Sequence, residues 1–180
     1  MAKRIIVLLL CLAALFALTS CGEKGINVSD EPQYYEGGVG DTMETYFFDF
    51  TVNSAHTSTT YGDVELDEGC FLIVNVTVKN TVSSTITMVD TDFQAQWTDE
   101  SDDAYCFPIT YEYEDGLLDE MRQLPASYDL ESGKSRNGEL VYVVPADEPE
   151  YSISYQELFV DNEGNESEGD VFFVYFTPEQ

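Results

Sequence analysis

The chain has 180 residues, with 35 acidic side chains against seven basic ones, and its formal net charge is −28. This charge excludes the DNA- and RNA-binding proteins, whose phosphate contacts depend on clustered lysine and arginine. Disorder is also excluded, because 43% of the residues are hydrophobic and 12 Tyr and 11 Phe supply material for a core. The length predicts a single domain after any targeting segment.

The chain begins with a short basic segment, Lys3 and Arg4, followed by an apolar run over residues 5–18. The run is shorter than the roughly 20 residues that a transmembrane helix needs, and it has the length of the apolar part of a signal peptide. Residues 1–20 are therefore predicted to be a signal peptide. Cys11 lies inside the run and would leave with it.

The run ends in a leucine, two small residues and a cysteine, namely Leu18, Thr19, Ser20 and Cys21. This segment resembles the lipobox, at which the precursor of a bacterial lipoprotein is lipidated on the cysteine and cleaved. The resemblance implies that Cys21 becomes a lipid-bearing N-terminus, and two or more acyl chains hold a protein stably on a membrane. An ordinary secretory signal followed by a chance cysteine is the alternative.

Residues 21–41 are rich in glycine and acidic side chains and show no apolar period. This composition predicts a flexible acidic tether. The domain would then cover residues 42–180.

From residue 42 onward, apolar residues alternate with a period of two, which is typical of β-strands. The clearest strand covers residues 70–80, where β-branched residues are dense. The last strand is apolar on both faces, which indicates a central strand or a face covered by a partner. Further strands are predicted at residues 43–53, 85–89, 93–97, 104–110, 138–145, 151–159 and 171–177.

One segment, residues 116–124, has the apolar spacing of a short helix, which Pro125 would end. The chain thus combines about seven or eight strands with at most one short helix, and no helices alternate with the strands. The predicted fold class is an all-β antiparallel sandwich.

Residues 71–80, an apolar strand that ends in Lys79 and Asn80, and residues 138–145, a glycine and an apolar strand before Pro145, carry a family resemblance. The chain resembles a family of Gram-positive surface lipoproteins with a single domain of unknown function. That domain resembles the secreted mycobacterial immunoprotective antigen, and some members carry a telomeric-repeat-binding-factor name. The resemblance spans roughly residues 40–177 and implies an immunoglobulin-like sandwich without catalytic residues. The family often has an Asp-Gly turn where this chain reads Asp102-Asp103-Ala104.

Two cysteines, Cys70 and Cys106, remain in the body after Cys21. Disulfides persist in exported proteins, and the expected strand order places Cys106 at the start of a strand beside Cys70. We therefore expect a Cys70–Cys106 disulfide, with two buried thiols as the alternative.

Few residues are candidates for a catalytic or metal site. His56 is the single histidine and lies in a segment rich in Ser and Thr, where we expect a solvated loop. Neither a catalytic triad nor a zinc site can be assembled from one histidine, so the protein is expected to be no enzyme and to need no cofactor. Two acidic loops are weak calcium candidates, with solvated turns as the alternative; their residues are Asp99, Asp102 and Asp103 in one loop, and Asp161 and Glu163 in the other.

The sequence thus predicts a lipid-anchored, extracellular binding or adhesion module on a Gram-positive cell membrane. Its expected partners are the membrane, through the lipid on Cys21, and an unknown surface or envelope protein, with no nucleic acid. The alternative is an acidic lipoprotein of the envelope that binds cations or acts structurally without a specific partner. Four tyrosines are candidates for a contact patch: Tyr105, Tyr111, Tyr113 and Tyr128.

Overall fold

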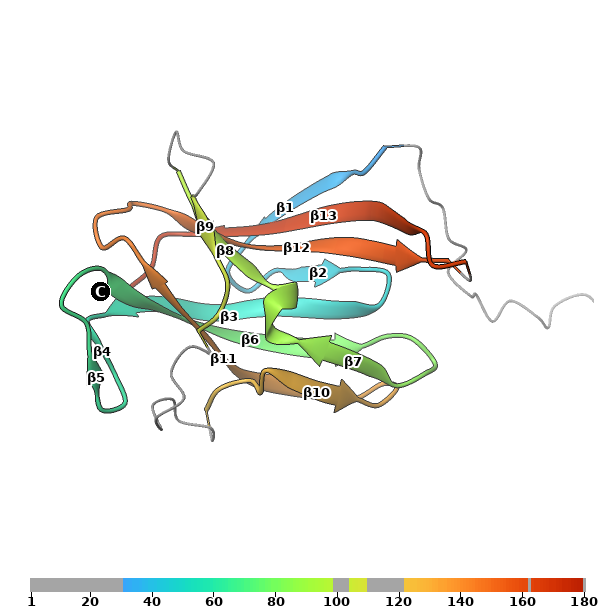
Figure 1. Ribbon diagram of the computed structural model, residues 1–180, viewed down its shortest axis with the longest axis horizontal. Coiled ribbons are helices and arrows are strands. Elements are labelled where there is room, and N and C mark those ends of the chain that lie inside the picture. The colour runs from blue at the N-terminus through green and yellow to red at the C-terminus, as the bar shows by residue number, and fades with distance from the viewer. Residues whose placement is uncertain (1–30, 99–103, 110–121, 162, 180) are drawn as a thin grey trace, which may run out of the picture.

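Two β-sheets face each other in the structure, a computed structural model that describes residues 31–98, 104–109, 122–161 and 163–179 (Figure 1). The five-stranded sheet, whose strands β1, β13 and β12 form the upper layer of Figure 1, has the order β1-β13-β12-β8-β9. Its strands are β1 (Tyr34–Gly38), β8 (Gln94–Trp97), β9 (Tyr105–Cys106), β12 (Tyr151–Val160) and β13 (Glu166–Phe176).

The second sheet has the order β11-β6-β3-β2 and is antiparallel throughout. Its strands are β2 (Thr42–Glu44), β3 (Phe48–Ser58), β6 (Cys70–Asn80) and β11 (Ser135–Val144). Together the two sheets form the all-β sandwich that the sequence predicts.

One small hairpin, a separate two-stranded sheet and one 3-10 turn complete the described fold. The hairpin pairs β4 (Thr60–Tyr61) with β5 (Val64–Glu65). The two-stranded sheet pairs β7 (Ile86–Val89) with β10 (Ser127–Leu130), and the turn is η1 (Asp90–Asp92). The described ranges thus contain 13 strands, more than expected because four of them have only two or three residues. No helix in these ranges has the length and apolar character needed to cross a membrane.

The core fills the space between the sheets because alternate residues of each strand point inward. Strand β6 shows this best, since Leu72, Val74 and Val76 are fully buried. Phe93 joins the two sheets: its ring centroid lies 5.4 Å from that of Phe50 on β3 and 6.1 Å from that of Tyr155 on β12.

A second, smaller cluster covers part of the outer face of the four-stranded sheet. It explains why β6 is apolar on both faces, as Phe71 and Ile73 are buried there by the β4–β5 hairpin and by the segment that ends at Ile109. The backbone of Ile109 donates a hydrogen bond of 2.9 Å to Val141 O of β11, which holds that segment on the sheet.

The tether predicted at residues 21–41 is wrong in its last part. Strand β1 pairs in parallel with β13, with Tyr34 opposite Val171, and is the parallel strand in a sheet that is otherwise antiparallel. Its backbone is bonded to a partner far away in the sequence, so local composition does not reveal it. Residues 21–30 lie outside the described ranges.

The strand predicted at residues 43–53 is in fact a hairpin of β2 and β3. Thr45 makes the turn, because its hydroxyl donates to Phe48 O at 2.6 Å and accepts from Phe48 N at 3.2 Å. Strand β3 then continues to Ser58, through a segment that we expected to be a loop.

Three sequence-based predictions lie outside the described residues: the signal peptide, the lipobox with Cys21, and most of the helix predicted at 116–124. At the end of that last segment, Gln123 forms a bridge to Glu139 beside β11.

Candidate functional site: the outer face of the five-stranded sheet

The outer face of the five-stranded sheet combines aromatic, serine and glutamine side chains in register. Paired residues of adjacent strands point to the same side of a sheet. In one row, Gln96 of β8 lies opposite Ser152 of β12, which lies opposite Tyr175 of β13. The neighbouring row repeats the pattern with Gln94, Ser154 and Phe173. We call these two rows, together with Tyr34, the outer face.

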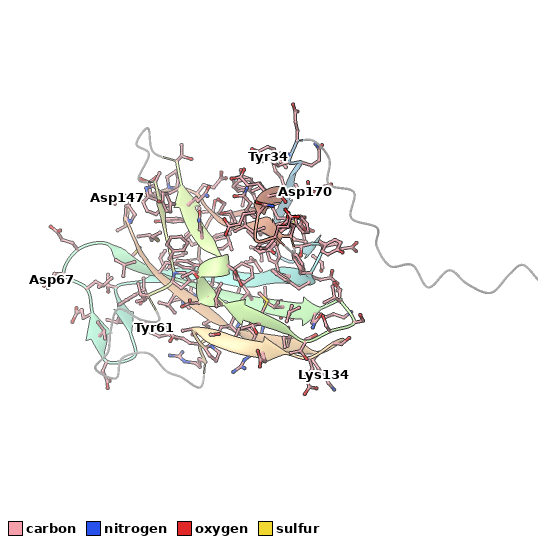
Figure 2. The ribbon with its side chains drawn as sticks, turned by 45° about the vertical axis from the view of Figure 1, so that its right-hand side comes forward. Tyr34, Tyr61, Asp67, Lys134, Asp147 and Asp170 are labelled. Carbon is pink, nitrogen blue, oxygen red and sulfur yellow. The ribbon has the colours of Figure 1, made fainter. Side chains whose placement is uncertain are left out.

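Aromatic rings line one side of the outer face. The ring of Phe173 lies 6.4 Å from that of Tyr34 and 5.9 Å from that of Tyr175, with interplanar angles of 15° and 17°. Tyr34 is 71% exposed and Tyr175 is 38% exposed. On the β1 side, the residue opposite Tyr175 is Gly38, which has no side chain to cover the ring. Figure 2 shows Tyr34 at the top of the molecule, close to Asp170.

Small polar residues form the floor of the outer face. Ser152 and Ser154 are buried although they point outward, because the larger side chains of β8 and β13 rise on both sides of them. The amide of Gln96 donates to Ser154 Oγ at 3.0 Å, which fixes the orientation of this side chain. The arrangement is a trough with an aromatic wall and an amide wall.

A hollow of about 180 Å³ lies at one end of this trough. One of the two rows, Gln96, Ser152 and Tyr175, lines this hollow. Trp97 and Glu150 line the end of the hollow. The hollow is smaller than the roughly 300 Å³ of an enclosed small-molecule site. It therefore suits a part of an extended ligand better than a whole compact one.

Charge is almost absent from the outer face, although the chain is strongly acidic. None of the five strands contains lysine or arginine, and both rows are uncharged from β8 to β13. Glu36 on the edge strand and Glu150 at the end of the hollow are acidic groups at the rim. Burial and these two carboxylates raise the pKa of Tyr175 above its ordinary value.

The outer face of the opposite sheet is different. Its amides bond to one another: Asn53 donates to Asn75 Oδ1 at 2.9 Å, and Asn137 donates to the same oxygen at 2.8 Å. The described basic residues also belong to this side of the molecule, around β6 and β11, as Figure 2 shows for Lys134. Among the described residues, this second face carries bonded amides in place of the aromatic wall.

The predicted calcium loops receive no support from the described residues. Asp161 caps its own turn between β12 and β13, since its carboxylate accepts from Glu163 N at 2.8 Å and from Asn165 N at 2.9 Å. Hydrogen bonds to the carboxylate lower the pKa of Asp161; the Asn165 side chain contributes most, and the backbone donors of Asn165 and Glu163 follow. No group of three or more metal-ligating side chains occurs in the part of the chain that the structure describes, and Asp99, Asp102 and Asp103 lie outside it.

The predicted Cys70–Cys106 disulfide is not formed in the structure. Cys70 lies opposite Val144 of β11, whereas Cys106 lies opposite Ala95 of β8 in the other sheet. The expected strand order is wrong, because β6 is flanked by β3 and β11 and not by the strand that ends at Trp97. The two thiols instead face Pro145 O at 3.8 Å and Val143 O at 3.6 Å.

The other predicted candidates fall in different places. His56 is exposed on strand β3, not in a loop, and lies opposite Ile73. Of the four tyrosines, Tyr105 is 47% exposed on β9, next to Gln96 of the outer face. Tyr128 is buried under Arg136, whose guanidinium lies 4.7 Å from the centre of its ring. Tyr111 and Tyr113 lie outside the described ranges.

Sequence reasoning missed most of the outer face. The one available signal was the last strand, whose second apolar side holds Phe173 and Tyr175. That strand is central, with β1 and β12 as its neighbours. The contributions of Gln94, Gln96 and the two serines depend on strand register, which a single sequence does not reveal.

Fold and site together define a β-sandwich protein with an uncharged aromatic trough on one sheet. The chain belongs to the family described as Domain of unknown function (DUF4352), whose model matches residues 37–165. A search of the curated proteins finds no match.

Several solved structures share the fold. The yjhA protein of Bacillus subtilis is 19% identical, with a TM-score of 0.54 over 77% of this chain and 99% of its own. The secreted protein MPT63 of Mycobacterium tuberculosis is 13% identical, with a TM-score of 0.53 over 83% of this chain and 100% of its own. Another, ycdA of Bacillus subtilis, is named as a lipoprotein; it is 19% identical, with a TM-score of 0.50 over 73% of this chain, which spans only 37% of ycdA.

Proposed function

We propose that this protein is a lipid-anchored extracellular binding module whose contact surface is the outer face of the five-stranded sheet. The observation that carries the proposal is the uncharged aromatic trough formed by Phe173, Tyr175 and the rows beside them on an acidic chain. A face that only keeps a protein soluble would carry charges like those of the remaining surface. Exposed aromatic side chains gathered on one side instead mark a contact surface.

Two further observations support the location. The segment that ends in Cys21 resembles a lipobox, and two proteins of similar fold are named as a secreted protein and as a lipoprotein. After loss of residues 1–20, five basic residues face 35 acidic ones, so anionic lipid head groups repel the body. The lipid must then provide the attachment to the membrane.

The anchor is tested by producing the full-length chain in a Gram-positive bacterium that is fed an alkyne-bearing fatty acid. We expect a labelled protein in the membrane fraction, and an unlabelled one after Cys21→Ser. Cys11→Ser is the matched control, because that cysteine leaves with the signal peptide and its loss should change neither label nor fraction. Equal labelling of the Cys21→Ser variant would refute the anchor.

The binding surface is tested with the mature chain, from position 21 onward and carrying Cys21→Ser, on isolated Gram-positive cell envelopes. We expect saturable binding that survives moderate salt and that Phe173→Ser lowers by about tenfold, as for a central aromatic contact. Tyr35→Ser is the control, because this tyrosine is also exposed on β1 but stacks on Phe172, on the other side of the sheet. Binding that disappears as salt rises, or that both variants weaken equally, would contradict the proposal.

A further inference from the structure

We propose that the ligand of the outer face is a neutral polysaccharide chain that lies along the trough. This inference rests on the proposed function, since it names the class of ligand for the same surface.

The polar groups of the trough match those of a sugar. Every sugar hydroxyl can both donate and accept a hydrogen bond, and the side chains of Ser and Gln can do the same. Among the described residues, no hydrogen bond engages Ser152 Oγ, Gln94 Nε2 or Gln96 Oε1. These atoms border the hollow or its neighbouring row, where a bound hydroxyl can reach them.

The aromatic wall matches the other surface of a sugar. A pyranose ring presents a flat side of C–H groups, which is less hydrated than its hydroxyl edge and packs against the face or edge of an aromatic ring. Tyr34, Phe173 and Tyr175 offer three nearly parallel rings in a row. Successive outward residues of a strand are about 6.8 Å apart, so the wall can contact successive parts of a chain that runs along β13.

The charge pattern selects a neutral polymer. An anionic chain lacks a counter-charge, since the five strands contain no lysine or arginine, and 35 acidic residues repel it. A cationic chain would find carboxylates at the rim, such as Glu36 and Glu150, and none in the two central rows. The two central rows provide no charge at all.

Shape and composition distinguish a sugar chain from a protein surface. The two walls stand on β8 and β13, on either side of β12, so they are about 10 Å apart. The floor between them is serine, a residue that is depleted in protein–protein interfaces. A narrow polar trough with a hollow at one end suits a single extended chain.

The test uses the mature chain with Cys21→Ser and five probes: cellohexaose, laminarihexaose, mannohexaose, maltohexaose and chitohexaose. Binding is measured by isothermal titration calorimetry, because the side chain of Trp97, the single tryptophan, packs against the core on the other side of the sheet. We expect at least one probe to bind saturably at millimolar concentration or below. Phe173→Ser and Tyr175→Ser should each weaken that binding by about tenfold, and Tyr175→Phe, which keeps the ring, by less.

One more variant tests the polar contacts, and one control tests the location of binding. Gln96→Glu keeps the size of the side chain but adds a charge and removes the amide donor, so it should weaken sugar binding about as much as loss of a ring. Tyr35→Ser should leave binding unchanged, and circular dichroism should show that each variant is folded. If none of the five sugars binds, or if a lysine polymer binds and a sugar does not, the inference is overturned. The proposed function would still stand in either case, provided that Phe173→Ser weakens the binding to envelopes and Tyr35→Ser does not.

Discussion

Replacing Phe93 with alanine is expected to destabilise the fold more than any exposed substitution. Phe93 is 1% exposed, and its ring lies within 6.1 Å, centre to centre, of Phe48, Phe50 and Tyr155. These neighbours belong to β3 in one sheet and β12 in the other. The substitution therefore opens a cavity at the point where the two sheets are joined.

The magnitude follows from the size of the group that is removed. Phe→Ala in a closed core costs about 3–5 kcal/mol, which combines lost transfer free energy with the cavity that remains. Domains of this kind have about 5–15 kcal/mol of unfolding free energy in total, so the variant loses a large share. Phe93→Leu keeps most of the volume and should cost only about 1–1.5 kcal/mol.

Urea denaturation of the mature chain, followed by circular dichroism, measures these values. With a denaturant slope of about 2 kcal/mol per molar, Phe93→Ala should lower the midpoint by about 1.5–2.5 M. Phe107→Ala is the matched control, because Phe107 is 42% exposed and should cost less than about 1 kcal/mol. If the two variants unfold at the same midpoint, the packing described for Phe93 is refuted.

Three further predictions concern single positions. Gly69 has a φ of 76°, and a Cβ there would lie 2.7 Å from Val144 O, so Gly69→Ala should lower the unfolding free energy by about 1–3 kcal/mol in urea denaturation. The control is Gly133→Ala, at a φ of 70° with open space around the new Cβ, which should cost only about 1 kcal/mol. Equal losses for the two variants would contradict the clash at Gly69. Burial raises the pKa of the Asp92 carboxyl in the folded chain, so its ionisation destabilises the fold as the pH rises from the pKa of the unfolded chain through that of the folded chain. Asp92→Asn should therefore raise the urea midpoint at pH 7, and this gain should vanish at a pH below the unfolded pKa. A gain that does not depend on pH would disprove this cause. The Cys70 thiol is buried, and that burial raises its pKa, so iodoacetamide should alkylate it about tenfold more slowly in the native chain than in urea. Equal rates would show that the Cys70 thiol is accessible to solvent in the native chain.

The sequence predicts those strands in which the pattern of apolar residues reflects burial of one face of the strand or of both faces. Residues 70–80 form a strand with the predicted bounds, because the β-branched run is packed on both sides. Strand β1 could not be predicted, since its sequence contains two glycines and its partner β13 is at the other end of the chain. Long-range pairing leaves no local period.

A turn without typical turn residues caused a second error. The alternation that begins at residue 43 continues through the β2–β3 turn without a glycine or proline, because the hydroxyl of Thr45 makes the turn. The outer face could not be predicted from the sequence for a related reason. Gln96, Ser152 and Tyr175 come from three segments, and they meet only once the order and register of the strands are known.

The pairing of β1 with β13 also determines when the outer face can exist. Tyr34 comes from the first described strand and Phe173 from the last, and the two strands that bear them are neighbours in the finished sheet. A chain that emerges N-terminus first presents Tyr34 long before its neighbour is made. The aromatic wall is thus complete only when the final strand has been synthesised and has inserted between β1 and β12. A chain that stalls or is clipped before β13 would keep its leading segment and its acidity, but it would have no trough.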